Sequence, residues 1–314
     1  MYDHQAKKLN EQGTFKEIVV EISARQLSAK SETLRQMSMF LTQAVFMEVC
    51  VHPKPGLVTR HGGGAHTDMS ILTFAAGSAV LAKAFSDLQI LGMKHNGNYQ
   101  ELFGKVRRYG VSAEQELLRV TKGVNTQRGI LFAGGLFAGA AMNKGLDSKA
   151  LCSIVAEMTQ GLTENELAGL QADRPLTAGE RLYQAYGITG IRGEVEAGFP
   201  SVRQNGLPGL KEAFAKGAGL NDALVHALVH LMTVVQDSNV IWRGGYAKLP
   251  FVQQRARDIL AQGSIFTDSG RRLLAESEEL FRNERISPGG SADLLSVTAA
   301  LYLVENKEFP VAII

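Results

Sequence analysis

Two short segments of the chain concentrate side chains that can bind an anion or a metal ion. Residues 53–58 (PKPGLV) place Lys54 in a turn made rigid by two prolines, and residues 64–69 (GAHTDM) combine a glycine, an imidazole and a carboxylate. Prolines fix φ and remove amide donors, whereas glycines let a ligand approach the main chain. A packed core does not require such turns. We therefore expect Lys54 to help bind an anionic ligand, together with a metal ion.

Two carboxylates lie near these turns. Asp68 follows His66 by two residues, and Glu48 lies near the end of the helical pattern that precedes the first turn. Carboxylate oxygens suit Mg²⁺, which is usually shared with substrate phosphates. For Asp68 the alternative is a capping role at a helix that starts near Ser70. Glu48 is a candidate for proton transfer.

Two segments in the middle of the chain repeat this combination of glycines and charge. Asn125 and Arg128 precede a glycine-rich helical pattern, where free amides and the helix dipole favour an anion. Arg192 and Glu194 stand among glycines and suit a bidentate phosphate contact and a proton transfer. The alternatives are a solvated helix cap at Asn125 and a structural ion pair between Arg192 and Glu194.

Two further segments follow in the C-terminal part. The pattern places Asp237 at the C-terminal end of a buried helix, where its charge opposes the helix dipole and needs a cation or a metal ion. Arg243 follows within a few residues. The segment 287–293 opens the last apolar helix and offers phosphate or metal contacts from Gly289, Gly290, Ser291 and Asp293. A plain helix start with an acidic first turn is the alternative.

Several familiar motifs are absent or incomplete. His226 and His230 have the i, i+4 spacing of a zinc pair, but Ala227 stands where a metalloprotease has its glutamate. Both histidines also lie opposite the main apolar stripe of their helix, so we interpret them as structural. The chain contains neither a Walker A sequence nor the Gly-x-Ser-x-Gly of a nucleophile elbow. A nucleotide would therefore bind by another route.

The elements that must position these residues are all helical. Apolar residues recur with a spacing of three and four from Ser31 almost to the end of the chain, and no alternating pattern competes. We predict an all-α fold, with residues 31–314 as a single large multi-helix domain whose site is built on the loops between helices. Residues 1–30 are predicted to be a peripheral extension. The expected helices span 31–52, 70–91, 99–121, 129–143, 148–161, 177–186, 207–217, 221–236, 250–262, 268–284 and 291–305.

The composition excludes some classes of partner. The 33 basic and 31 acidic residues are spread along the 314 positions, which leaves no basic patch for nucleic acid or a membrane surface. No apolar run reaches the roughly 18 residues that a membrane span needs. Cys50 and Cys152 lie in apolar helical patterns and are predicted to be buried thiols. We expect a soluble, cytoplasmic protein.

Taken together, the segments resemble the triphosphoribosyl-dephospho-CoA synthase family. The resemblance covers roughly residues 35 to 305, and ordered blocks of this length are unlikely to match by chance. The matching blocks are Glu48 with 53–58 (PKPGLV), 64–66 (GAH) with 68–69 (DM) and Phe74, 123–126 (GVNT), 176–183 (LTAGERLY), Gly190 with 192–194 (RGE) and 198–200 (GFP), Asp237 with 239–240 (NV) and 243–245 (RGG), and 287–295 (SPGGSADLL).

Four positions, at three places in the chain, depart from the family pattern. Thr59 stands where an aspartate is usual, Gln127 with Arg128 replaces a His-Lys pair, and Ser238 replaces a threonine. Arg128 keeps the cation and Ser238 keeps the hydroxyl. Thr59 removes a carboxylate, so no role is carried over to that position.

The resemblance implies transfer of the 5-triphosphoribosyl group of ATP to the 2′-hydroxyl of 3′-dephospho-CoA, with release of adenine. The product would be the prosthetic-group precursor of citrate lyase or malonate decarboxylase, passed on to a transferase that acts on an acyl carrier protein. The implied phosphate-binding residues are Lys54, Asn125, Arg128, Arg192, Arg243, Gly289, Gly290 and Ser291. The implied Mg²⁺ ligands are Asp68, Asp237 and Asp293, and the implied proton-transfer residues are Glu48 and Glu194.

Two other functions use the same residue types. An all-α hydrolase that attacks a ribose C1′ would need the same carboxylates and metal, with water as the nucleophile. A helical nucleotide-binding regulator without turnover would use the acidic residues only as metal ligands. Dependence of adenine release on dephospho-CoA separates both from the transferase.

Overall fold

The computed structural model describes residues 29–141, 147–168 and 175–312, with side chains from residue 36 onward. All secondary-structure elements in these ranges are helices, which confirms the predicted all-α fold. Of the predicted extension 1–30, all but Ala29 and Lys30 lie outside the described residues. The α-helices are α3 (Ala29–Cys50), α4 (Ile71–Met93), α5 (Tyr99–Val120), α6 (Arg128–Ala140), α7 (Ser148–Met158), α8 (Ala178–Tyr186), α9 (Ile191–Glu196), α10 (Leu207–Ala215), α11 (Leu220–Met232), α12 (Ser238–Gly244), α13 (Lys248–Ala261), α14 (Asp268–Asn283) and α15 (Gly289–Asn306). Short π or 3₁₀ segments are η1 (Glu164–Ala168), η2 (Val202–Gly206) and η3 (Ser264–Phe266).

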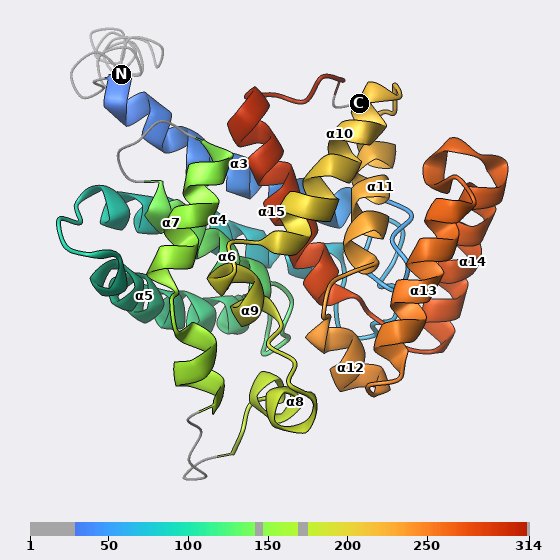
Figure 1. The fold of residues 1–314 in the computed structure, drawn as a ribbon, viewed down its shortest axis with the longest axis horizontal. Helices are drawn as coiled ribbons and strands as arrows, with labels where there is room; N and C mark the ends of the chain where they lie inside the picture. Colours follow the sequence, from blue (N-terminus) through green and yellow to red (C-terminus); the bar gives the residue numbers. More distant parts are fainter. Residues whose placement is uncertain (1–28, 142–146, 169–174, 313–314) are drawn as a thin grey trace, which may run out of the picture.

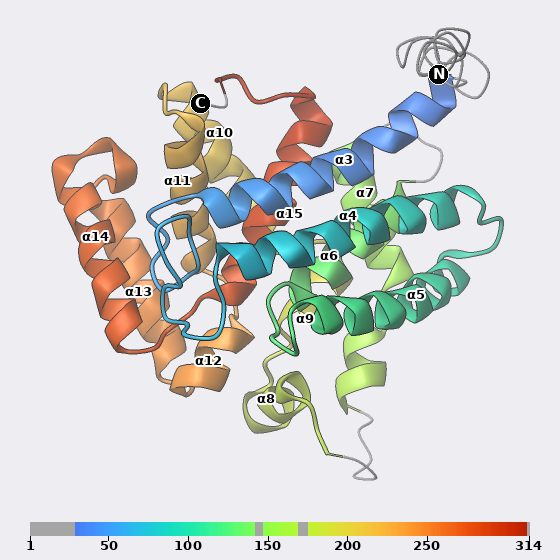
Figure 2. The same cartoon turned by 180° about the vertical axis from the view of Figure 1, so that it is seen from behind.

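Helices α3, α4, α6 and α15 form the centre of the molecule. Helix α3 packs against α4 and α15, and α6 packs against α4 and α15. Figure 2 shows α3 and α4 lying side by side across one face, with α6 behind them. Glycines of α6 permit this close packing, since a Cβ on Gly134 would lie 2.7 Å from a ring carbon of Phe85 in α4, and one on Gly135 would lie 2.9 Å from Leu88. The weak helix propensity of α6 is therefore offset by burial.

A second group of helices packs on the other side of α15. Helix α11, apolar nearly all round in sequence, is buried along residues 223–229 and lies between α10, α13 and α15. Helices α13 and α14 form the outer edge of this group (Figure 1). Helices α8 and α12 are short and lie toward the bottom of Figure 1, and the short helix α9 packs against α6 and α7. All three contribute residues to the candidate site.

The sequence pattern missed two short helices that matter for function. Helices α9 and α12 each contain or adjoin glycines, so both segments were expected to be loops. In the structure Arg192 and Glu194 stand on α9, and Arg243 stands on α12. Helix α11 also ends earlier than predicted, at Met232. Several site residues therefore occupy helix ends, where the backbone holds them more rigidly than a loop would.

Two expectations from composition need correction. Helix α4 is long and apolar enough to cross a membrane by length and composition alone, although no such run was expected. One face of this helix contributes Leu81, Phe85 and Leu88 to the core, and another face carries the ion pair between Lys83 and Asp87. Cys152 is buried as expected, but Cys50 is exposed.

Candidate active site

One pocket brings together most of the residues that the sequence singled out. It has a volume of about 710 Å³ and lies where the ends of α3, α6, α9, α12 and α15 meet. The expected site residues that line it are Glu48, Asp68, Asn125, Arg128, Arg192, Glu194, Arg243, Gly289, Gly290 and Asp293. Three others, Lys54, Asp237 and Ser291, do not line the pocket. Lys54 contacts the lining residue Glu48, Asp237 contacts the lining residue Asn239, and Ser291 contacts Asp237.

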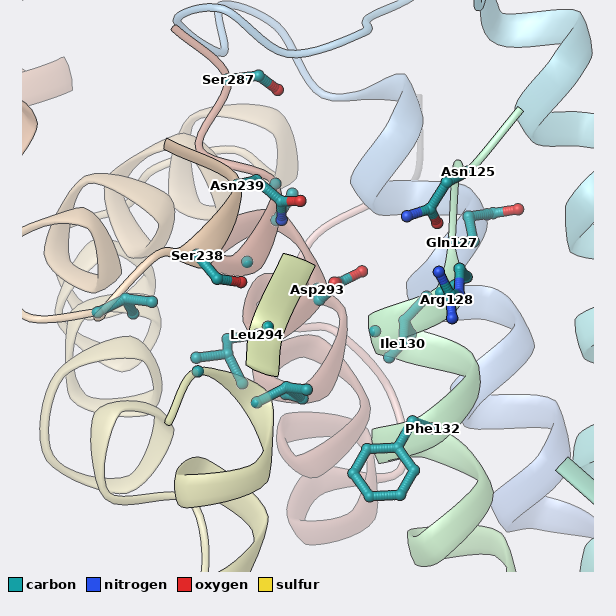
Figure 3. A pocket seen from close by; sticks show the side chains of 18 of the residues that line it. Asn125, Gln127, Arg128, Ile130, Phe132, Ser238, Asn239, Ser287, Asp293 and Leu294 are labelled. Carbon is teal, nitrogen blue, oxygen red and sulfur yellow. The ribbon is translucent and has the colours of Figure 1, made fainter. Parts of the chain in front are cut away.

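Asp293 projects from the first turns of α15 into the pocket, toward the start of α6 (Figure 3). The amide of Ile130 donates a hydrogen bond to its carboxylate, which therefore lies at the positive end of the α6 dipole. Burial raises the pKa of Asp293 well above its usual value, and the negative charges of Glu48 and Asp237 raise it further. A cation bound in the pocket would relieve this repulsion.

Gly129 is the residue that lets α6 approach Asp293. A Cβ at this position would lie 2.0 Å from Oδ2 of Asp293. We expect Gly129→Ala to displace the carboxylate and to lower kcat for the pocket's reaction by at least about tenfold. The matched control is Gly104→Ala in α5, where a Cβ meets no atom within 4 Å. If both variants retain wild-type kcat in steady-state assays, the position of Asp293 does not matter.

Glu48 forms a buried ion pair with Lys54. The two side chains are 8% and 1% exposed, and the Lys54 ammonium donates to Oε1 of Glu48. Lys54 thus lies beneath the pocket, and its ammonium is paired with the Glu48 carboxylate. Removing one member of a buried pair leaves the other charge uncompensated. In this arrangement Lys54 positions Glu48, whose carboxylate lines the pocket.

Asp237 caps two helices at once. Its Oδ1 accepts from the amides of Asn239 and Val240 at the start of α12, at 3.1 and 3.4 Å. Its Oδ2 accepts from the amide and hydroxyl of Ser291 in the first turn of α15, at 2.8 and 3.0 Å. The prediction that Asp237 ends a helix and opposes its dipole is wrong. The carboxylate begins α12, where the dipole favours it.

This double cap predicts a large effect on stability. Asp237→Ala leaves buried amides at two helix ends without an acceptor, and we expect a loss of about 2–4 kcal/mol in the free energy of unfolding. Asp147 caps α7 alone, accepting from Lys149 and Ala150, so Asp147→Ala should cost only about 1 kcal/mol. Urea denaturation of both variants measures the difference. Equal losses would contradict the double cap.

Glu166 holds two arginines at the pocket wall. Its Oε2 accepts from Arg192 Nε at 2.8 Å and from Arg107 Nη2 at 3.0 Å. Arg192 therefore pairs with Glu166, and the alternative of an ion pair with Glu194 is not realised. Arg107 also lines the pocket, although nothing in the helical pattern of α5 marked it. The pair presents two guanidinium groups to an anion.

Glu194 lies partly buried on α9 and lines the pocket. The hydroxyl of Ser201 donates to its Oε1, and the Ser201 amide donates to Oε2 at 3.3 Å. Burial raises the pKa of Glu194, and the two hydrogen bonds from Ser201 oppose this shift. A carboxyl group whose pKa is raised toward neutrality is suited to proton transfer.

Arg243 and His66 form the opposite rim. Arg243 donates to the carbonyl oxygen of Ala65 at 2.9 Å and lies 3.2 Å from Nδ1 of His66. Burial and the Arg243 charge lower the pKa of His66, so the imidazole is neutral at neutral pH. Asp68 is exposed, and its Oδ1 lies 3.7 Å from His66 Nδ1. Ser70, rather than Asp68, is the N-cap residue of α4, so the capping alternative is not realised.

The start of α6 supplies further polar groups. Arg128 is the first residue of the helix, where it pairs with Glu114 at 2.6 Å, and Asn125 lies exposed just before it. The hydroxyl oxygen of Thr126 is buried and has no hydrogen-bond partner within the protein. Buried polar atoms are normally satisfied, so an unpaired hydroxyl in a pocket wall is suited to meet a ligand. Figure 3 shows Asn125 and Arg128 on the side of the pocket opposite Ser238 and Asn239.

Sequence reasoning missed three residues of this site. Arg107 and Glu166 carried no local signal, because their role depends on α5 and η1 meeting α9. Trp242 also lines the pocket, is 52% exposed and lies under the Arg181 guanidinium, 5.9 Å from its ring centroid. Because Trp242 is the single tryptophan of the chain, the sequence could have singled it out as a candidate site residue.

Comparison with known proteins identifies the family. The family model described as ATP:dephospho-CoA triphosphoribosyl transferase matches residues 34–309. A probable 2-(5′′-triphosphoribosyl)-3′-dephosphocoenzyme-A synthase of Malonomonas rubra is 38% identical over 281 residues, covering 87% of this chain and 89% of the relative. The 2-(5′′-triphosphoribosyl)-3′-dephosphocoenzyme-A synthase of Klebsiella pneumoniae is 37% identical over 281 residues, covering 88% of this chain and 93% of the relative. No solved structure matches the chain. The chain belongs to the ATP:dephospho-CoA triphosphoribosyl transferase family.

Proposed function

We propose that this chain transfers the 5-triphosphoribosyl group of ATP to the 2′-hydroxyl of 3′-dephospho-CoA and releases adenine. The bond between C1′ and adenine breaks, a bond between C1′ and the acceptor oxygen forms, and the hydroxyl proton is lost while adenine gains one. The observation that carries the proposal is the single pocket in which arginines and carboxylates from the family's separate sequence blocks face one another. The triphosphate must stay intact throughout.

The arginines suit the first task, which is to hold a polyphosphate. Arg107, Arg128, Arg192 and Arg243 line the pocket, and each is oriented by a protein acceptor or by His66. Planar guanidinium groups bind phosphate oxygens bidentately and do not lose their charge. The glycine-rich start of α15 lets the backbone approach the ligand as well. The amide of Ser291 is the exception, since it is committed to Asp237.

Two carboxyl groups suit the proton transfers. Glu48 is paired with Lys54 and is placed to accept the proton of the attacking hydroxyl. Glu194, whose pKa is raised by burial, is placed to donate a proton to the departing adenine. The raised pKa of Glu194 favours this group as the acid. The transition state is oxocarbenium-like, as in glycoside cleavage, and the nearby carboxylates stabilise its charge.

We further propose that Mg²⁺ accompanies the triphosphate. The carboxylates of Glu48 and Asp293 repel each other at the pocket, and this repulsion contributes to the raised pKa of Asp293. The Asp293 carboxylate fits a hard cation that takes one or two carboxylates and completes its shell with phosphate oxygens and water. Asp68 could reach the same ligand from the rim. Asp237 would act indirectly, because both its oxygens already accept hydrogen bonds. When bound, the ion neutralises phosphate charge.

The wider role follows from the reaction. The product retains a triphosphate at the end of a new ribose, so it is activated for transfer to a protein. We propose that a transferase acting on an acyl carrier protein consumes it, and that the reaction takes place in the cytoplasm.

Arg192→Met should weaken ATP binding without abolishing turnover. The change removes a charged contact to phosphate, and we expect the ATP dissociation constant to rise by about 10- to 100-fold. Fluorescence of Trp242 measures binding directly, because it is the only tryptophan and lines the pocket. The control is Arg119→Met, since Arg119 pairs with exposed Glu116 and does not line the pocket. An unchanged dissociation constant in Arg192→Met would remove this residue from the phosphate site.

Adenine release in the presence of ATP, Mg²⁺ and dephospho-CoA tests the proposed reaction. We expect release that requires dephospho-CoA and stops when dephospho-CoA is consumed. Release that proceeds equally without dephospho-CoA would instead establish a ribosyl hydrolase. If the protein binds ATP but releases no adenine, with or without dephospho-CoA, it is a regulator.

A further inference from the structure

Two histidines and a glutamate converge away from the pocket, where α10 packs against α11 (Figure 1). His226 and His230 stand one turn apart on α11, and Glu212 faces them from α10. The two Nε2 atoms are 3.1 Å apart, and Oε2 of Glu212 lies 3.8 and 3.9 Å from them. In the described part of the chain, this is the one group of three such side chains whose ligand atoms lie within 4.8 Å of one another.

These distances leave room for a metal ion. Zinc binds imidazole nitrogen at about 2.0–2.1 Å and carboxylate oxygen at about 2.0–2.2 Å. An ion in the plane of the three atoms, about 2.05 Å from each nitrogen, would lie about 2.2 Å from Oε2 and subtend an angle of about 100° between the nitrogens. All three bonds are therefore reached without moving the backbone. The side chain of His230 is partly exposed and that of Glu212 is exposed, so water can complete the coordination.

Both imidazole rings are held in place by neighbouring elements. Nδ1 of His226 lies 2.9 Å from the hydroxyl of the buried Ser264 in η3. In the tautomer that carries its proton on Nδ1, the ring donates a hydrogen bond to this hydroxyl and the lone pair of Nε2 can bind a metal ion. The His230 ring packs on Gly209 of α10, where a Cβ would lie 2.7 Å from Cδ2. Burial lowers the pKa of both histidines, that of His226 to about 4, so both rings are neutral at neutral pH.

We propose that Glu212, His226 and His230 bind a single Zn²⁺ ion that ties α10 to α11. The interpretation of the two histidines as structural rested on the missing glutamate at Ala227 and on their position opposite the main apolar stripe of the helix. The third ligand comes instead from the preceding helix. The other carboxylate oxygen of Glu212 pairs with Lys216 at 2.6 Å, so Oε2 remains directed at the histidines.

Titration of the full-length protein with Zn²⁺, without nucleotide, tests the site. We expect one Zn²⁺ per chain by calorimetry and a rise in melting temperature on binding. His230→Ala and Glu212→Gln should each weaken binding by at least about tenfold. Both side chains are partly exposed, so these variants should fold.

Two further variants separate a metal site from an ordinary surface ion pair. Glu284→Gln is the matched control, because Glu284 pairs with Lys248 at 2.7 Å as Glu212 pairs with Lys216, and it should bind Zn²⁺ like the wild type. Lys216→Gln removes a cation beside the site and should tighten binding. The proposal is overturned if the wild type binds no Zn²⁺, or if His230→Ala and Glu212→Gln bind it as the wild type does.

Discussion

Glu194→Gln should lower kcat for adenine release by about 10²- to 10⁴-fold, the usual contribution of one positioned acid or base. The amide keeps the size of the side chain and can still accept from Ser201, so the fold and ATP binding should be preserved. Steady-state kinetics, with Trp242 fluorescence to confirm ATP binding, measure both effects. The control is Glu196→Gln, because Glu196 lies on the same helix and accepts from Thr163 without lining the pocket. Near-native kcat in Glu194→Gln would exclude proton transfer by this residue.

The raised pKa of Glu194 also predicts a pH dependence. A general acid must be protonated, so kcat should fall as the pH rises through the pKa of Glu194, which burial places above its ordinary value of 4.5. The alkaline limb assigned to this group should be absent from the residual activity of Glu194→Gln. A limb that persists unchanged in the variant would belong to another residue.

Asp293→Asn should abolish most activity while leaving the protein as stable as the wild type, or more stable. The carboxylate interacts with Glu48 and accepts a hydrogen bond from the Ile130 amide at the start of α6, and its loss should reduce kcat by about 10²-fold or more. An asparagine can still accept from the Ile130 amide but carries no charge to be repelled by Glu48 and Asp237. Functional sites commonly retain such destabilising charges.

The pH dependence of the free energy of unfolding tests whether Asp293 is kept for activity or for stability. Because the pKa of Asp293 is raised in the folded protein, the folded state holds its proton more tightly than the unfolded state does. Wild-type stability should therefore fall as the pH rises from 3.8, the ordinary value, through the raised pKa. Asp293→Asn should remove this decline. A variant that is both inactive and strongly destabilised at neutral pH would contradict the expectation.

The sequence predicted the helical scaffold and much of the pocket for physical reasons. The spacing of apolar residues follows from the helix period, so long helices such as α5 and α14 appear within a few residues of their predicted bounds. Glycines beside charged residues mark places where a backbone turns or a ligand approaches. That local signal led to Arg128, Glu194 and Asp293.

What the sequence could not predict depends on contacts between distant segments. Arg107 looks like any exposed residue of α5 until Glu166 is placed beside it. Lys54 was expected to bind phosphate, but its burial against Glu48 follows only from the packing around the first turn. Asp237 was assigned to the wrong end of a helix because residues 233–236 continue the apolar pattern after α11 has ended.

The fate of the triphosphate tests the central claim most directly. ATP labelled in its γ-phosphate should be incubated with the enzyme, Mg²⁺ and dephospho-CoA, and the label should be followed by chromatography with mass analysis. If the pocket holds the polyphosphate while the ribose changes partners, the label will appear in the dephospho-CoA product in equal amount to the adenine released. Label recovered as orthophosphate or pyrophosphate, or adenine formed without labelled product, would contradict the account.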